Sequence, residues 1–232
     1  FVRSGDVSVP GLPVRTLGQN PSKPSYLALG EELGAGLPES NYVFYDDSLY
    51  VAPLKGAKAL GRLVGSYFNR TVDHFCSHNQ TPYADETTHP VAVVKGRWAY
   101  LAPALFAAYR EHAFGVYKAI LAAILERVLP APVVRVDAPS AMEVSLNRQV
   151  KARRWVAHLV NFQPQRRHTH VEWIERLYPV RDIALAVRTA RPPKAVTLAP
   201  QGTPLPFTMK GDYCEVIVPE VHAHQMVAFE GV

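Results

Sequence analysis

Three side chains that can bind metal ions alternate along one polar segment of the chain: His74, Cys76 and His78. On an extended backbone, residues two positions apart point to the same side, so these three would face one way. Zinc accepts histidine nitrogen and cysteine sulfur in a tetrahedral arrangement. The spacing matches no common zinc module, however, and we predict no metal site, with metal binding kept as the less favoured alternative.

The same polar stretch, residues 69–90, predicts a long surface loop, and long loops in compact domains are usually functional or disordered. Aromatic residues accompany its histidines: Tyr67, Phe68, Phe75 and Tyr83. Because aromatic side chains are enriched at interfaces, we favour a loop that packs against a neighbouring domain or subunit over one that is merely exposed. The candidate residues of this loop are Asn69, Arg70, His74, Cys76, His78 and Asn79.

Adjacent carboxylates form the next candidates for chemistry: Asp46–Asp47 and Asp85–Glu86. Glycoside hydrolysis needs two carboxyl groups that face each other across the scissile bond. Neighbouring residues on a strand point to opposite faces, so neither pair can bracket a substrate by itself. We therefore expect solvated turn acids and no catalytic residue. Cys76 lacks the flanking glycines of a nucleophile elbow, which makes an amidotransferase-like enzyme the least favoured hypothesis.

Tryptophan is a third kind of candidate, because sugars stack on indole rings. Trp98 and Trp155 lie in strand-like patterns and are expected in the core. Trp173 lies in a polar neighbourhood and is the best candidate for an exposed sugar contact.

Composition limits the classes of partner. The net charge is +5 and the pI about 9.2, but the basic residues are scattered and no nucleic-acid-binding motif accompanies them. We predict no nucleic-acid partner. No apolar run approaches the roughly 20 residues that cross a bilayer, so no membrane partner is predicted either. The two cysteines, Cys76 and Cys214, are far apart in the sequence, which argues against a disulfide framework. The expected location is cytoplasmic.

The elements that must position these residues change in type near residue 131. A helical pattern covers residues 103–129, and Gly115 can divide it. It follows strand signals at 42–45, 57–64, 91–94 and 98–101. These indicate an α/β layer. From there on, turn signals separate short strand candidates at 133–136, 142–147, 155–160, 183–187, 195–199, 213–218 and 226–230. This spacing predicts an antiparallel β-sandwich. The predicted domains are 1–131 and 132–232.

Several motifs, in order, resemble a family of multidomain enzymes. The run from Gly96 to Pro103, continuing to Pro130, resembles the end of the trimerisation domain of β-galactosidase-type glycoside hydrolases. The β-domain that follows the trimerisation domain in those enzymes is resembled by five segments of this chain: residues 133–136, 139–140, 158–161, 179–182 and 219–222. Residues 67–71 and 74–78 have counterparts in the α-L-fucosidase-like branch. The resemblance extends from about Tyr26 over most of the chain.

This resemblance implies a partial flavodoxin-like, class I amidotransferase-like trimerisation domain followed by a β-sandwich, in a homo-oligomer without cofactors. Such enzymes carry catalysis in an N-terminal (β/α)₈ barrel, which this sequence lacks. The chain is therefore expected to be a non-catalytic accessory and assembly region. Its parent enzyme would hydrolyse terminal β-galactosides or α-L-fucosides, and the loop at 69–90 would approach the barrel and its carbohydrate substrate. The alternative is a stand-alone carbohydrate-binding β module.

Overall fold

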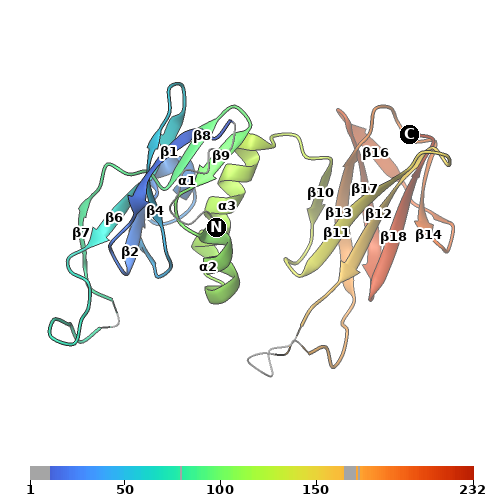
Figure 1. Ribbon diagram of the computed structural model, residues 1–232. Coiled ribbons are helices and arrows are strands. Elements are labelled where there is room, and N and C mark those ends of the chain that lie inside the picture. The colour runs from blue at the N-terminus through green and yellow to red at the C-terminus, as the bar shows by residue number, and fades with distance from the viewer. Residues whose placement is uncertain (1–10, 79, 165–170, 172) are drawn as a thin grey trace. The chain divides into compact units, whose positions relative to one another are not determined.

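The computed structural model describes residues 11–78, 80–164, 171 and 173–232, and the chain divides into two compact units. Unit 1 is Phe1–Ala131 and unit 2 is Pro132–Val232. Both units are dominated by antiparallel strands, and the described helices all belong to unit 1 (Figure 1). Among the described residues, no helix combines the length and the hydropathy that a bilayer-spanning segment requires.

The described residues of unit 1 form three small antiparallel sheets, which share one core. The first pairs β1 with β4, the second has the order β3-β2-β6-β7, and the third has the order β5-β8-β9. The strands are β1 Val14–Gln19, β2 Ser25–Ala28, β3 Asn41–Phe44, β4 Leu49–Pro53, β5 Lys58–Leu60, β6 Arg62–Ser66, β7 Tyr83–Glu86, β8 Ala92–Lys95 and β9 Trp98–Leu101.

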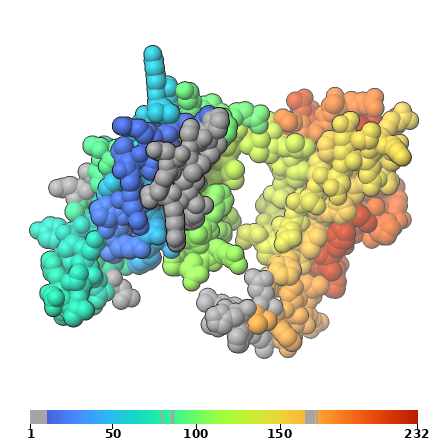
Figure 2. Space-filling view, in the orientation of Figure 1, coloured from blue at the N-terminus to red at the C-terminus, as the bar shows by residue number. Residues whose placement is uncertain are grey.

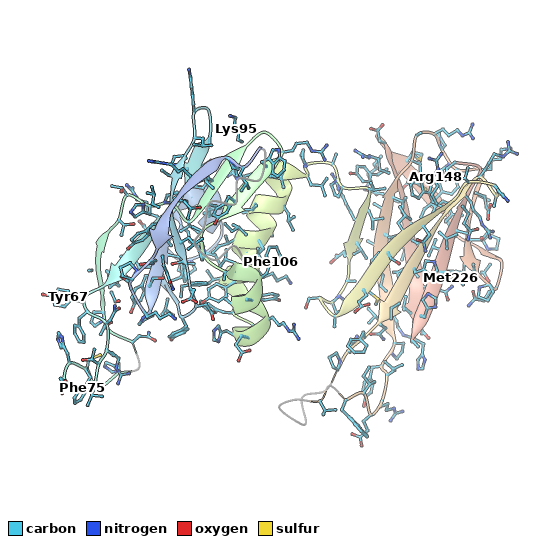
Figure 3. The ribbon with its side chains drawn as sticks, viewed as in Figure 1. Tyr67, Phe75, Lys95, Phe106, Arg148 and Met226 are labelled. Carbon is cyan, nitrogen blue, oxygen red and sulfur yellow. The ribbon has the colours of Figure 1, made fainter. Side chains whose placement is uncertain are left out.

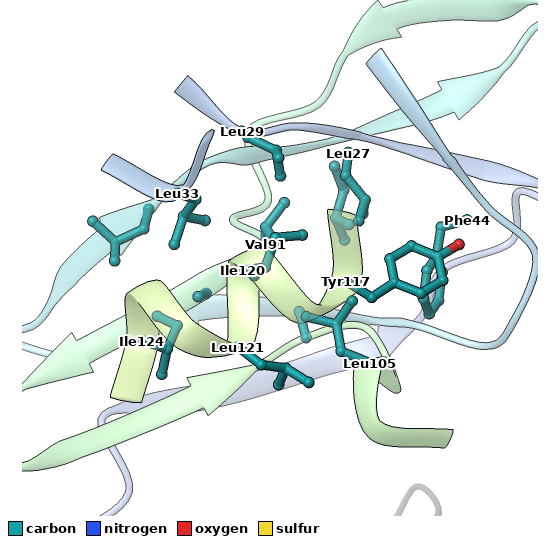
Figure 4. Close-up of a cluster of buried hydrophobic side chains, with 14 of the residues drawn as sticks. Leu27, Leu29, Leu33, Phe44, Val91, Leu105, Tyr117, Ile120, Leu121 and Ile124 are labelled. Carbon is teal, nitrogen blue, oxygen red and sulfur yellow. The ribbon is translucent and has the colours of Figure 1, made fainter. Parts of the chain in front are cut away.

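The helices in the described part of unit 1 are α1 Gly30–Gly34, α2 Leu105–His112 and α3 Gly115–Val128. The buried face of α3 follows the helical repeat and packs on strand residues, as the cluster of Leu27, Phe44 and Val91 with Tyr117 and Ile120 illustrates (Figure 4). The predicted helical stretch over 103–129 is confirmed as two helices. They are separated at Ala113, which adopts a left-handed conformation with φ of 50°.

The flavodoxin-like α/β domain predicted for residues 1–131 is wrong. A flavodoxin-like sheet is parallel, and each parallel connection needs a crossover of a dozen or more residues, usually a helix. Every strand pairing among the described residues of unit 1 is antiparallel, and hairpin turns such as Lys95–Trp98 join successive strands. The helices α2 and α3 therefore follow the last strand of the unit instead of alternating with strands.

The predicted strand over 57–64 is also divided, because the chain changes sheets at Gly61. Its φ is +60°, and a Cβ at this position would lie 2.9 Å from the carbonyl oxygen of Ala28. A glycine is needed where the backbone takes this conformation and another backbone atom approaches so closely. This turn sends β5 into one sheet and β6 into the next, and β6 then leads to the candidate loop.

Unit 2 is an antiparallel β-sandwich, as predicted. One sheet has the order β10-β13-β17-β16 and the other the order β11-β12-β18-β14-β15. The strands are β10 Val134–Asp137, β11 Met142–Gln149, β12 Arg154–Asn161, β13 Val180–Arg188, β14 Ala195–Ala199, β15 Thr203–Pro204, β16 Phe207–Lys210, β17 Tyr213–Val221 and β18 His224–Glu230. Alternate residues such as Leu185, Val216 and Phe229 fill the space between the sheets.

Two buried ionisable groups predict that the protein loses stability at high pH. Burial raises the pKa of the Cys214 thiol from 9.0 to about 11, and burial together with the charges of Asp46 and Tyr45 raises the pKa of Tyr117 from 10.0 to about 12. The unfolded chain then releases protons that the folded chain retains. The free energy of unfolding is therefore expected to fall as the pH rises from 9 towards 11 in unit 2, and from 10 towards 12 in unit 1.

Urea unfolding at a series of pH values checks this expectation. The Cys214→Ala variant supplies the control, because it lacks the thiol and should show a smaller decrease for unit 2 over the same range. Equal pH dependence in the parent protein and the variant would contradict the role of the thiol.

Candidate functional site

The candidate loop connects β6 to β7, and its described residues 67–78 and 80–82 are called the aromatic loop below. In the space-filling view its teal residues form a projection from the body of unit 1 (Figure 2). Asn79 lies outside the described residues, so its predicted role stays a prediction.

The base of the aromatic loop is tied to the body of unit 1. The Tyr67 backbone N–H donates to the Pro82 carbonyl at 2.9 Å, and the Thr81 hydroxyl donates to the Phe68 carbonyl at 2.8 Å. Thr81 is buried, and its own carbonyl accepts a hydrogen bond from the Tyr26 hydroxyl. These bonds hold the two ends of the loop side by side, so the projection has a defined base.

Asn69 connects the aromatic loop to the turn between β1 and β2. Its side-chain oxygen accepts from the Lys23 backbone N–H at 2.8 Å, and its side-chain nitrogen donates to the Pro21 carbonyl at 2.8 Å. Both ends of the amide are therefore used inside the unit. Arg70 follows it as an exposed residue. Both residues are exposed, but only the Asn69 side chain has these two bonds to the neighbouring turn, which suit a positioning role.

His74 also has a structural role in the aromatic loop. Its ring stacks on Phe68 with 3.8 Å between ring centroids and an angle of 10° between the planes. A local turn fixes its backbone: the Thr71 N–H donates to the His74 carbonyl at 2.9 Å, and the His74 N–H donates to the Thr71 hydroxyl at 3.0 Å. Stacking and turn together organise the tip of the loop.

The structure does not gather the possible metal ligands of this segment into one site. The Cys76 sulfur lies 3.5 Å from the His78 carbonyl oxygen and 3.6 Å from the Gln80 carbonyl oxygen. His89 is engaged elsewhere, because its ring stacks on Tyr50 at 4.0 Å. Within the described part of the chain, no three His, Cys, Asp or Glu side chains form a group that could hold a metal ion.

The aromatic loop exposes apolar side chains from its first residue, Tyr67, to its tip. Tyr67, Val72 and Phe75 are 78%, 91% and 66% exposed. Figure 3 shows Tyr67 and Phe75 on this projection, away from the body of unit 1. Scattered exposed apolar residues are ordinary, but a concentration of them on one projecting segment is typical of an interaction surface. The geometry therefore favours contact with another protein surface over binding of a metal.

The adjacent carboxylates are drawn apart by different partners. Asp46 lies 3.2 Å from the His112 ring nitrogen on α2, whereas Asp47 forms an ion pair with Lys23 at 2.7 Å. Both carboxylates thus have local structural partners, and they do not face each other across a cleft. Asp85 and Glu86 lie on β7, and their side chains are outside the described structure.

Two tryptophans of interest lie at the surface. Trp98 is 47% exposed, so its predicted place in the core is wrong. The physical reason is that β9 forms the edge of the sheet β5-β8-β9, and Trp98 is its first residue. Trp173 is 55% exposed and lies beside a hollow of about 560 Å³ whose lining includes Ile174, Tyr178 and His222. Its contact with sugar stays a prediction.

Sequence reasoning missed a second surface, which lies on unit 2. The outer face of the sheet β10-β13-β17-β16 forms a trough of about 560 Å³, lined among others by Arg135, Asp137, Ala184, Ala186 and Glu215. The signal that could have found it is the sequence Ile-Ala-Leu-Ala-Val at 183–187, in which large residues alternate with small ones. Small residues on the outer face of a central strand leave space that neighbouring side chains enclose.

Comparison with known proteins relates the chain to a glycoside hydrolase. No family model and no curated protein matches it. Among solved structures, the α-L-fucosidase isoenzyme 2 from Paenibacillus thiaminolyticus matches 95% of this chain with a TM-score of 0.84 and 29% sequence identity. The chain covers 34% of that protein, so it spans about a third of its length. The predicted likeness to α-L-fucosidase-like hydrolases is thus confirmed.

A second solved structure is far less similar. A cycloisomaltooligosaccharide glucanotransferase from Paenibacillus sp. matches 41% of the chain with a TM-score of 0.31 and 16% identity, and 16% of its own length is covered. This match is too weak to inform the fold or the function. The chain is therefore described as a region related to glycoside hydrolases on the likeness to the fucosidase alone.

Proposed function

We propose that this chain is a non-catalytic accessory region of a glycoside hydrolase that acts on α-L-fucosides. The observation that carries the proposal is the match to one third of an α-L-fucosidase, which extends over nearly all of this chain at 29% identity. Two compact units that together correspond to part of an enzyme suit a supporting role beside a catalytic domain.

The non-catalytic part of the proposal is supported by the chemistry of the described carboxylates and of Cys76. Glycoside hydrolysis needs an acid and a second carboxylate at about 5–9.5 Å on opposite sides of the glycosidic bond. Asp46 and Asp47 are held by His112 and Lys23 instead. Cys76 faces two carbonyl oxygens, which would repel a thiolate and so disfavour a nucleophilic role.

The aromatic loop supplies the proposed contact with the catalytic domain. Its base is hydrogen-bonded, its tip is organised by the stacking of His74 on Phe68, and it exposes Tyr67, Val72 and Phe75. A preorganised loop loses little conformational entropy on docking, and aromatic side chains are frequent anchors of interfaces. We propose that these apolar residues pack against the catalytic domain, and that Asn69 and His74 position them.

The first test is turnover by the purified chain alone, with aryl α-L-fucoside and aryl β-galactoside as substrates. We expect no hydrolysis above the uncatalysed rate for either substrate, because His112 and Lys23 engage the adjacent carboxylates Asp46 and Asp47. A polypeptide that joins the chain to a catalytic barrel serves as the positive control, and it should hydrolyse the α-L-fucoside. Turnover by the chain alone that persists after repurification would overturn the accessory role. A joined enzyme that hydrolyses only the β-galactoside would overturn the choice of substrate.

A further inference from the structure

The trough on unit 2 owes its shape to two alanines on a central strand. Ala184 and Ala186 lie on the outer face of β13, where strand pairing places Asp137 and Arg135 of β10 beside them on one side. On the other side, Ile217 and Glu215 of β17 are their partners. Adjacent strands are about 4.8 Å apart, so the two walls lie roughly 10 Å apart at the backbone. The floor between the two walls is therefore about as wide as one small ring.

The polar groups of the trough are held in place by contacts within unit 2. The Arg135 guanidinium lies over the Tyr213 ring at 4.1 Å, and the Tyr213 hydroxyl donates to the Pro132 carbonyl at 2.6 Å. Lys210 and Glu215 form an ion pair at 2.6 Å. Asp137 is exposed and has no ion-pair partner among the described residues. Its carboxylate is therefore free to accept hydrogen bonds from a ligand, next to a donor that is already oriented.

We propose that this trough binds a neutral saccharide. A pyranose ring has an apolar face of C–H groups and a rim of hydroxyl groups, which suits an apolar floor flanked by hydrogen-bonding walls. The charged lining residues are two cations, Arg135 and Lys210, and two anions, Asp137 and Glu215, so the site has no net charge. A nucleic acid would require an excess of positive charge. The volume of about 560 Å³ lies within the range of small-molecule sites.

Different residues of the trough contact different parts of the sugar. Ala184, Ala186 and the exposed side chain of Ile217 receive the apolar face of the sugar. Asp137 and Glu215 accept hydrogen bonds from hydroxyl groups on opposite rims, and Arg135 donates to a ring or hydroxyl oxygen. Charge-assisted hydrogen bonds are stronger than neutral ones, which compensates for the openness of the site to water. This site does not rest on the accessory function, because it concerns binding by unit 2 alone.

The experiment is a titration of the purified chain with L-fucose, D-galactose and D-glucose, followed by two-dimensional NMR of the backbone amides and by calorimetry. We expect at least one of these sugars to bind with a Kd on the order of 1 mM and to shift amides of β10, β13 and β17. The Ala184→Trp variant should weaken binding by about 10-fold or more, because the indole fills the floor. The Asp137→Ala variant should weaken it by about 10-fold and tests the site if Ala184→Trp does not fold.

The matched control is Ala195→Trp, which makes the same change at an exposed alanine of β14 in the opposite sheet. It should bind sugar like the parent protein. The proposal is overturned if none of the three sugars binds, or if both tryptophan variants weaken binding equally. It is also overturned if the shifted amides cluster around Trp173 instead of the trough. Turnover assays on the chain do not affect these outcomes, so failure of the accessory function and failure of this site are distinguishable.

Discussion

Replacing Tyr117 by alanine is expected to lower the free energy of unfolding of unit 1 by about 3–5 kcal/mol. Tyr117 is fully buried at the centre of the unit, where its ring meets Phe44 edge to face at 5.6 Å and Phe114 at 5.2 Å. Its hydroxyl donates to the Val43 carbonyl at 2.9 Å. Alanine would remove the ring, leave a cavity beneath α3 and leave that carbonyl without its donor.

Two further variants divide this loss into its parts. Tyr117→Phe keeps the ring and removes only the hydrogen bond to Val43, so we expect a loss of about 1–2 kcal/mol. Leu125→Ala removes an exposed side chain of the same helix and should cost less than about 1 kcal/mol. Urea unfolding followed by ellipticity at a helix wavelength reports on unit 1, because the described helices belong to it. A Tyr117→Ala protein as stable as Leu125→Ala would show that Tyr117 does not anchor this core.

Removing two exposed aromatic side chains of the aromatic loop, Tyr67 and Phe75, is expected to weaken docking to the catalytic domain strongly. Central aromatic anchors of an interface each contribute about 2 kcal/mol or more, so the double variant Tyr67→Ser with Phe75→Ser should lose about 4 kcal/mol. The measurement is the unfolding of a polypeptide in which this chain follows a catalytic barrel. In the parent polypeptide unit 1 and the barrel should stabilise each other, and in the variant they should unfold at separate, lower midpoints.

A matched variant separates docking from general surface effects. Phe106 on α2 is 68% exposed, much like Phe75, but lies outside the aromatic loop (Figure 3). Phe106→Ser should leave the coupled unfolding unchanged. In the isolated chain, the loop variant should change stability by less than about 0.5 kcal/mol, because both side chains are already exposed there. Coupling that survives the loop variant would refute the proposed docking surface, and association of the isolated chain through these residues would point to a second copy as the occupant.

Part of the fold followed from local patterns in the sequence. Large residues alternate with small or polar ones along 144–146 and 183–187, and a period of two is the signature of a strand with one buried face. Turn residues between such segments then require antiparallel neighbours, which led correctly to the β-sandwich. The helical repeat over 116–124 was equally visible, because each buried residue recurs one turn later on the same face of α3.

The arrangement of unit 1 could not be read in the same way. Whether strands pair in parallel or antiparallel depends on which partners they find, and β2 pairs with both β3 and β6. The resemblance to a flavodoxin-like domain supplied a parallel sheet, but the strands pair antiparallel even where the connection contains a helix, as between β2 and β3. Gly61 shows the difficulty: its role depends on the carbonyl of Ala28, which is distant in sequence and close only in the folded chain.

The residues available for chemistry could be read directly from the amino-acid order: the histidines and Cys76 of one loop, the adjacent carboxylates and Trp173. How they are used depends on the folded chain. Asn69 bonds to residues 46 and 48 positions earlier, and His74 stacks on Phe68 instead of turning to a metal. The trough needs side chains from β10, β13 and β17, which are separated along the chain. Strand pairing brings these residues together, and the strands that pair here are far apart in the sequence.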